Sequence, residues 1–207
     1  MSLCIVLNNP NNFTIISSDG NLTNIKGEIV KDNHSKLTKL TDYIMIFISG
    51  LQNYCEELRI ILNNKITNKT PLNIICDIIQ NESIILHNKI LSKYPNYLNM
   101  LDNKITTIAT VLGFYNIFTN ECGYINFCHS KNFNPIIITC SSINCRGIQQ
   151  ELAQEYIINN FNTDNIIDII YSAYKIISIK ENAVGGNISI YKIDKIGIKL
   201  IKEGDLN

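Results

Sequence analysis

The sequence lacks tryptophan and has only two arginines among its 207 residues, Arg59 and Arg146. Its 18 acidic and 18 basic residues cancel, and the lysines form no patch or stripe, so nucleic-acid binding is disfavoured. No apolar run approaches the ~20 residues that span a bilayer. The start has no basic region, and the apolar run 3–7 is too short for a signal peptide. We therefore expect a soluble intracellular protein.

The sequence also lacks a Cys-x-x-Cys pair, although it contains seven cysteines. Cys122, Cys128 and His129 come nearest to a metal cluster, but their spacing suits ligands poorly. Free thiols buried as small apolar residues in a reducing compartment are the better interpretation. We expect no metal and no cofactor. His34 and His87 have no evident partners in the sequence.

The first fifty residues organise the chain, and they predict two adjacent hairpins. Apolar, β-branched runs at 3–9 and 13–18 flank an Asn/Pro turn. Shorter strands are expected at 27–31 and 35–40, and a buried strand at 43–48. Because the chain begins with a buried strand and no leader, we expect its amino terminus to lie inside the fold.

Helical periodicity appears in two later pairs of segments. The first pair covers 51–62 and a helix from Thr70–Pro71 to about 94, with Thr70 as N-cap. The second pair covers 147–160 and a helix that is capped by 162–164. Strands are expected between and after these pairs, at 106–114, 123–128, 135–140, 187–193 and 198–201, with a turn or short strand at 115–120.

The resulting order is strands, two helices, strands, two helices, strands, and no linker divides it. This order predicts one α+β domain over residues 1–207. The strands are apolar on both faces, which requires that both faces be covered. We therefore predict a four-layer αββα sandwich, in which two antiparallel sheets pack face to face and each carries a helix pair outside.

Three motifs in this order are similar to a known family: Ile16-Ser-Ser-Asp19, Lys36 and Ile48-Ser-Gly50. Together with the layer order they resemble the proteasome beta subunits, which have the N-terminal-nucleophile hydrolase fold. Residues 1–50, including the run Lys31-Asp-Asn-His-Ser-Lys36, look most like the fourth, non-catalytic beta subunit of the eukaryotic 20S particle. The similarity is looser over 51–110 and 128–180.

The resemblance implies a possible catalytic site at the amino terminus. In active members a Thr, Ser or Cys becomes the first residue, and its α-amine, with a pKa of ~7.7–8.0, acts as its base. Lys36 takes the position of the family lysine, Asp19 that of its carboxylate partner, and Gly50 that of the oxyanion-hole turn. Removal of the initiator methionine would expose Ser2 as an alternative nucleophile.

Two departures from the family pattern predict an inactive site. The ungapped alignment places Met1 at the position of the nucleophile, and using Ser2 would require a one-residue slip of the strand. The late Asp and Ser-Gly of active members become Glu181 or Asn182, and Val184 or Gly185. Met1, Asp19, Lys36 and Gly50 then form a vestigial pocket, in which Asp19 and Lys36 make a buried or half-buried ion pair.

The resemblance thus predicts a non-catalytic structural subunit of the 20S core beta ring. Such a subunit would contact other beta and alpha subunits in stacked seven-membered rings and line the chamber for ubiquitin-dependent protein degradation. It would work in the cytoplasm and nucleus, without nucleic acid or membrane. The alternative is an active peptidase that uses Ser2 in a homo-oligomeric, bacterial proteasome-like particle. An unrelated α+β protein is a third interpretation.

Overall fold

The computed structural model describes residues 2–24, 28–97 and 107–206, and it confirms the α+β class. The described residues form twelve strands in three antiparallel sheets, with four α-helices. The strands are β1 (Leu3–Asn9), β2 (Phe13–Ser18), β3 (Leu22–Thr23), β4 (Ile29–Lys31), β5 (Leu37–Thr41), β6 (Ile44–Gly50), β7 (Ile108–Asn116), β8 (Glu121–Cys128), β9 (Ile136–Ile138), β10 (Ser142–Gly147), β11 (Asn187–Asp194) and β12 (Gly197–Asp205). The helices are α1 (Gln52–Lys65), α2 (Leu72–Lys93), α3 (Gln150–Asn159) and α4 (Ile166–Lys180).

The first sheet joins the two ends of the described chain. Its order is β10-β1-β2-β11-β12, so the opening hairpin pairs through β2 with the closing hairpin through β11. The second sheet has the order β5-β6-β7-β8-β9, and a two-stranded sheet pairs β3 with β4. The two hairpins of the first fifty residues therefore belong to different five-stranded sheets.

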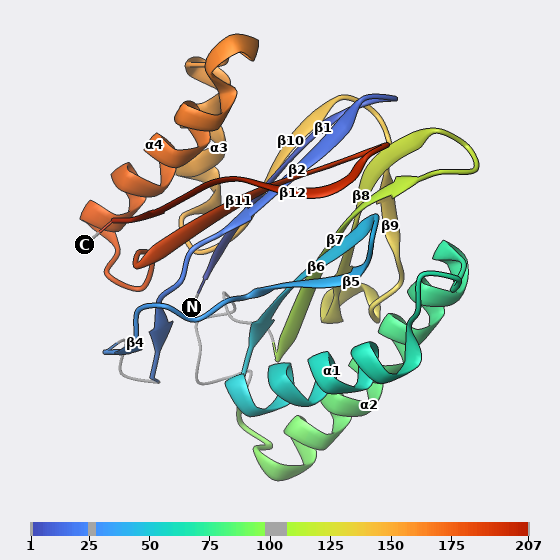
Figure 1. The fold of residues 1–207 in the computed structure, drawn as a ribbon. Helices are drawn as coiled ribbons and strands as arrows, with labels where there is room; N and C mark the ends of the chain where they lie inside the picture. Colours follow the sequence, from blue (N-terminus) through green and yellow to red (C-terminus); the bar gives the residue numbers. More distant parts are fainter. Residues whose placement is uncertain (1, 25–27, 98–106, 207) are drawn as a thin grey trace.

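The elements stack in layers, with α3 and α4 on one side and α1 and α2 on the other (Figure 1). Three apolar clusters fill the spaces between the layers. One lies between the second sheet and α1/α2, and another between the first sheet and α3/α4. The third joins the sheets to each other, and it contains Val6 and Ile16 from the first and Phe47 and Val111 from the second.

Strand β1 shows how alternating side chains supply the clusters on the two faces of the first sheet. Leu3, Ile5 and Leu7 belong to the cluster beneath α3 and α4, whereas Cys4 and Val6 belong to the cluster between the sheets. Because side chains alternate along a strand, a shift of one residue would exchange the two sets. Pairing with β2 on one side and β10 on the other holds this register.

Three local predictions were wrong, and each has a physical cause. The sequence analysis missed β10, because it is an edge strand in which Cys145 is the one buried side chain. It also missed β3, the two-residue partner of β4, whose side chains are half-buried, although β4 itself lies within the strand expected at 27–31. Thr70 does not cap α2: its Oγ1 accepts from Thr67 N–H, and Pro71 occupies the N-cap.

Helices α1 and α2 each bury residues at helical spacing, among them Leu58 and Leu62 on α1 and Ile79 and Leu86 on α2. Burying each such side chain contributes about 1.5–3 kcal/mol. Within the described ranges, no helix combines the length and the apolar character that crossing a membrane requires.

Candidate functional site

Asp19 and Lys36 form the ion pair that the sequence analysis expected. Asp19 follows β2 directly and Lys36 precedes β5, so the pair joins the first sheet to the edge of the second. Lys36 Nζ lies 2.6 Å from Asp19 Oδ2, and the two side chains are 5% and 0% exposed. Such a short, charge-assisted contact is strong, but both charges have lost their hydration.

Burial dominates the electrostatics of the pair. It raises the pKa of the Asp19 carboxyl, while the Lys36 charge, its hydrogen bond and the Leu3 amide oppose that shift. Burial likewise lowers the pKa of the Lys36 ammonium, against the attraction of Asp19. Each group depends on the other to remain charged, so removal of either partner leaves an expensive buried charge.

The pair is tied to the start of β1 by the backbone. Leu3 N–H donates to Asp19 Oδ1 at 2.9 Å, so both carboxylate oxygens are engaged. A second buried contact lies behind it, where the Tyr174 hydroxyl of α4 meets Ser17 Oγ at 3.1 Å and Leu3 O at 3.4 Å. The amino-terminal strand is therefore held from two sides.

Tyr174→Phe is expected to lower the free energy of unfolding by about 1–2 kcal/mol, the cost of a buried hydrogen bond without new strain. Ser17 Oγ keeps its bond to Ile5 O, which limits the loss. Tyr171→Phe on the same helix is the control, because its hydroxyl bond to Asp205 O is exposed. Urea denaturation of both variants measures the difference, and equal losses would contradict the assignment.

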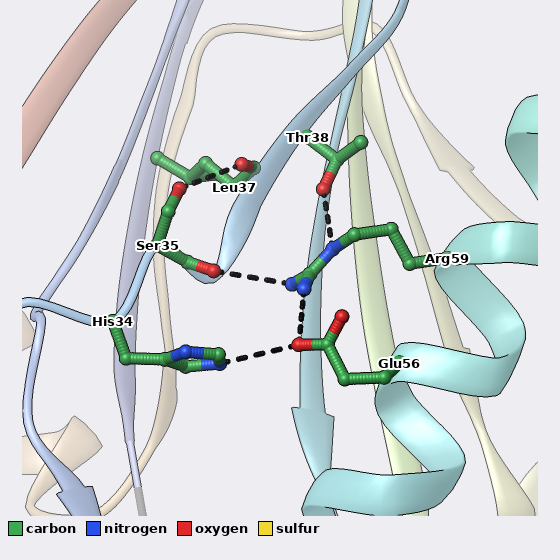
Figure 2. Close-up of polar contacts among 6 residues, drawn as sticks. All are labelled: His34, Ser35, Leu37, Thr38, Glu56 and Arg59. Carbon is green, nitrogen blue, oxygen red and sulfur yellow. Dashed lines mark hydrogen bonds and ion pairs between the residues drawn. The ribbon is translucent and has the colours of Figure 1, made fainter. Parts of the chain in front are cut away.

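Helix α1 holds the segment that carries Lys36 through Arg59 (Figure 2). Arg59 Nη2 donates to Ser35 O at 3.2 Å, and Arg59 Nε donates to Thr38 Oγ1 at 2.7 Å. Its remaining contact is with Glu56 Oε1, at 2.5 Å from Nη1. The guanidinium thus fixes the chain on both sides of Lys36, as its planar fork of donors allows.

Gly50 ends β6 and lies two residues beyond Ile48, whose N–H donates to Lys36 O. Its φ of +141° suits glycine, and a Cβ there would lie 2.2 Å from Thr107 O. That oxygen accepts from Leu51 N–H, and the Thr107 hydroxyl lies 2.7 Å from His87 Nδ1 on α2. The turn after β6 is therefore held by α2 as well as by β7.

The backbone of Ser2 lies next to the Asp19–Lys36 pair, because the following residue, Leu3, binds Asp19. Its carbonyl accepts from Ile148 N–H at 3.0 Å, and a Cβ on Gly147 would lie 1.9 Å from the same oxygen. Leu3, the next residue, carries the amide that binds Asp19. Ser2 thus sits one residue from the ion pair with its carbonyl fixed, whereas Met1 lies outside the described residues.

The segment 181–186 also reaches the site, but it does so through main-chain atoms. Gly185 O accepts from the amides of Gly20 and Asn21, directly after Asp19. Asn182 O accepts from Asn21 Nδ2, while Glu181 Oε1 turns back to Ala183 N–H. Val184 is buried. No side chain of this segment makes a hydrogen bond to Ser2 or Leu3 in the described structure.

A cavity of about 250 Å³ adjoins the pair on the side of Asp19. Every lining residue carries a polar group, and the set comes from the end of β2, the segment before β5, and strands β11 and β12. Its members are Ser18, Asp19, Asn33, His34, Ser35, Asn187, Ser189, Tyr191 and Glu203. It is smaller than the ~300–1,000 Å³ typical of sites for drug-sized ligands.

The described residues contain no group of three His, Cys, Asp or Glu side chains placed to hold one metal ion. Cys122 and Cys128 lie at opposite ends of β8, so the loose cluster seen in the sequence does not assemble. Cys122 Sγ instead donates to Asn9 O.

Sequence reasoning left His34 and His87 without partners, and the structure provides partners for both. His34 Nε2 lies 3.6 Å from Glu56 Oε1. His87 bonds Thr107 and stacks on His129, with ring centroids 5.7 Å apart. Tyr174 and the Leu3 amide were missed as well, because nothing in a local pattern connects residues of α4 with those of β1 and β2.

No protein-family model matches the chain, and a search of curated proteins finds no significant match.

Proposed function

We propose that the chain has the N-terminal-nucleophile hydrolase fold and is a non-catalytic beta subunit of a 20S proteasome core particle, most like the fourth. The observation that carries this proposal is the buried Asp19–Lys36 pair, anchored to the first strand through the Leu3 amide. The helix–sheet–sheet–helix order of the layers supports the same fold (Figure 1). Asp19, Lys36 and Gly50 are then the remnant of a nucleophile pocket.

The absence of catalysis is inferred from the surroundings of the first strand. An N-terminal nucleophile requires an α-amine that is oriented by neighbouring side chains. The segment 181–186 approaches Asp19 with carbonyl groups, and Val184 or Gly185 takes the position at which active members of the family would place a serine. The fixed carbonyl of Ser2 and the paired register of β1 oppose the shift that would bring Ser2 into position.

The proposed work of the subunit is packing against alpha and beta neighbours and lining a proteolytic chamber, in the cytoplasm and nucleus. Among the residues that the structure describes, three large apolar side chains are almost fully exposed, Phe118 (90%), Ile179 (83%) and Ile196 (86%). Apolar side chains of this kind are suited to burial at the centre of subunit interfaces.

Mass spectrometry of the native complex tests this assignment. We expect the chain to co-purify with other, distinct beta and alpha chains. A particle that contains one repeated beta chain would contradict the proposal.

The second candidate is a Ser2 peptidase, favoured by the position of Ser2 one residue from the amide that binds Asp19. Intact mass and an epoxyketone probe distinguish the two functions. For the non-catalytic subunit we expect no probe adduct and equal, background peptide hydrolysis by wild type and Ser2→Ala. Loss of Met1 together with labelling that Ser2→Ala abolishes would establish the peptidase instead.

A further inference from the structure

A row of polar side chains crosses three neighbouring strands of the first sheet. Strand pairing sets Ser18 of β2 opposite Ser189 of β11, and Ser189 opposite Glu203 of β12. Residues directly opposite each other share a face of the sheet, with Cβ atoms about 4.5–5.5 Å apart. All three residues line the cavity of about 250 Å³ beside Asp19, so the row forms one wall of that cavity.

The row faces away from α3 and α4. Ser17, the neighbour of Ser18, points toward α4, where its hydroxyl meets that of Tyr174. The two residues that flank Ser189, 188 and 190, belong to the apolar cluster beneath the same helices. Because successive side chains point to opposite faces of a strand, Ser18 and Ser189 point to the other face, where the segment 33–35 completes the lining of the cavity.

Ser18 supplies the floor of the cavity with an available hydroxyl. The residue is 3% exposed, and within the described part of the chain its hydroxyl has no hydrogen-bond partner. Buried polar groups are nearly always hydrogen-bonded, so this hydroxyl suits a ligand. Asp19 lies next to it on the floor, with Lys36 Nζ 2.6 Å from its Oδ2. Because a cation is already present there, the floor favours a neutral hydrogen-bonding group over a second cation.

The rim of the cavity has the opposite preference. Glu203 is exposed, and its carboxylate accepts from the neutral amide of Asn187. His34 is the one basic side chain among the described residues of the lining, and burial lowers the pKa of its imidazole, so the ring is uncharged at pH 7. No cation in that lining balances the charge of Glu203, which therefore attracts a positive group.

The dimensions of the wall limit the ligand to a short chain with two different polar ends. Two spacings of the row place the Cβ atoms of Ser18 and Glu203 about 10 Å apart, so one small group cannot reach both side chains. With about 30 Å³ for each water-sized group, the cavity takes about eight of them, enough for a short linear molecule. An anion would meet the carboxylates of Asp19 and Glu203 instead of a cation.

We propose that this cavity binds a short amino alcohol. The hydroxyl of the ligand bonds Ser18 Oγ at the floor, and its primary ammonium group, which has three donors and no acceptor, lies near Ser189 and Glu203 at the rim. In this orientation the positive charge points away from Lys36. The inference goes beyond the proposed function, which gives the cavity no role, and it does not depend on it.

An NMR titration of the amide resonances of the full-length protein at pH 7 tests the site with three probes. Aminobutanol carries an amine and a hydroxyl at opposite ends of a linear chain, butylamine lacks the hydroxyl, and butanediol has a second hydroxyl in place of the amine. We expect saturable shifts at the amides of Ser18, Ser189 and Glu203, with aminobutanol binding at least about threefold more tightly than either other probe.

Two variants test the orientation, because each removes the partner of one end. In Glu203→Gln we expect aminobutanol to weaken at least about threefold while butanediol is unchanged. In Ser18→Ala we expect aminobutanol to weaken by a similar factor while butylamine is unchanged. The controls Ser178→Ala and Glu121→Gln carry the same changes outside the cavity lining, and they should bind aminobutanol as the wild type does.

The wild type by itself decides the matter if a variant fails to fold. Equal affinity for the three probes, or no saturable shift at the cavity amides, would overturn the proposal. Sodium or potassium chloride that produces the same shifts at the same concentration would show a metal-ion site instead. Loss of butanediol binding in Glu203→Gln would contradict the assignment of the ammonium to the rim.

Discussion

Lys36→Met is expected to lower the free energy of unfolding by about 3–5 kcal/mol, since it leaves a buried carboxylate without its cation. Asp19 is fully buried, and its remaining partner is the neutral Leu3 amide, which cannot balance the charge. Urea denaturation at pH 7 measures the loss.

Lys39→Met is the matched control, because Lys39 pairs with Asp42 on the surface, where the side chains are 54% and 55% exposed. Exposed pairs contribute about 0–1 kcal/mol, so this variant should stay close to wild type. The double variant Asp19→Asn/Lys36→Met should be more stable than Lys36→Met, since a neutral amide can still accept from Leu3 N–H. Equal losses for Lys36→Met and Lys39→Met would refute the buried-charge argument.

Gly50→Ala is expected to cost about 2–5 kcal/mol, from backbone strain and overpacking together. The φ of +141° is unfavourable for alanine, and the new Cβ would lie 2.2 Å from Thr107 O. Because that oxygen belongs to the backbone and accepts from Leu51 N–H, relief of the clash would disturb the start of α1. Thermal and urea unfolding measure the cost.

Gly113→Ala separates this effect from ordinary crowding. A Cβ at Gly113 would meet Ile193 Cδ1 at 3.0 Å, which is the flexible tip of a side chain, and its φ needs no glycine. We expect a loss below about 1.5 kcal/mol there. If Gly50→Ala costs no more than Gly113→Ala, the turn after β6 is not constrained in the way described.

Local signals in the sequence predicted most of the elements. The β-branched runs around the Asn/Pro turn correspond to β1 and β2, and helical spacing identified α1 and α2. These signals are reliable because a residue and its neighbours decide which face of a strand or helix is apolar. They also sufficed for the α+β class.

The pairing of the hairpins was decided in three dimensions. The first two hairpins are adjacent in the chain, yet they belong to different sheets. Strand β2 pairs with β11, which lies near the carboxyl-terminal end of the described chain. Strand β10 gave little local signal, because its main contribution is an edge pairing with β1. Such choices depend on which apolar faces can cover one another.

The candidate site likewise contains some residues that could be singled out from the sequence and others that only the structure reveals. Asp19, Lys36 and Gly50 were selected because the sequence resembles a known family at these positions, and the structure brings Asp19 and Lys36 into contact. The sequence by itself thus determined the class and most elements, and its resemblance to a known family singled out the residues of the charged pair. Only the tertiary structure decided which groups surround that pair: the Leu3 amide, Tyr174 and the contacts of Glu56 with His34 and Arg59. Hydrogen bonds between distant segments depend on how the layers stack, and no local pattern encodes that stacking.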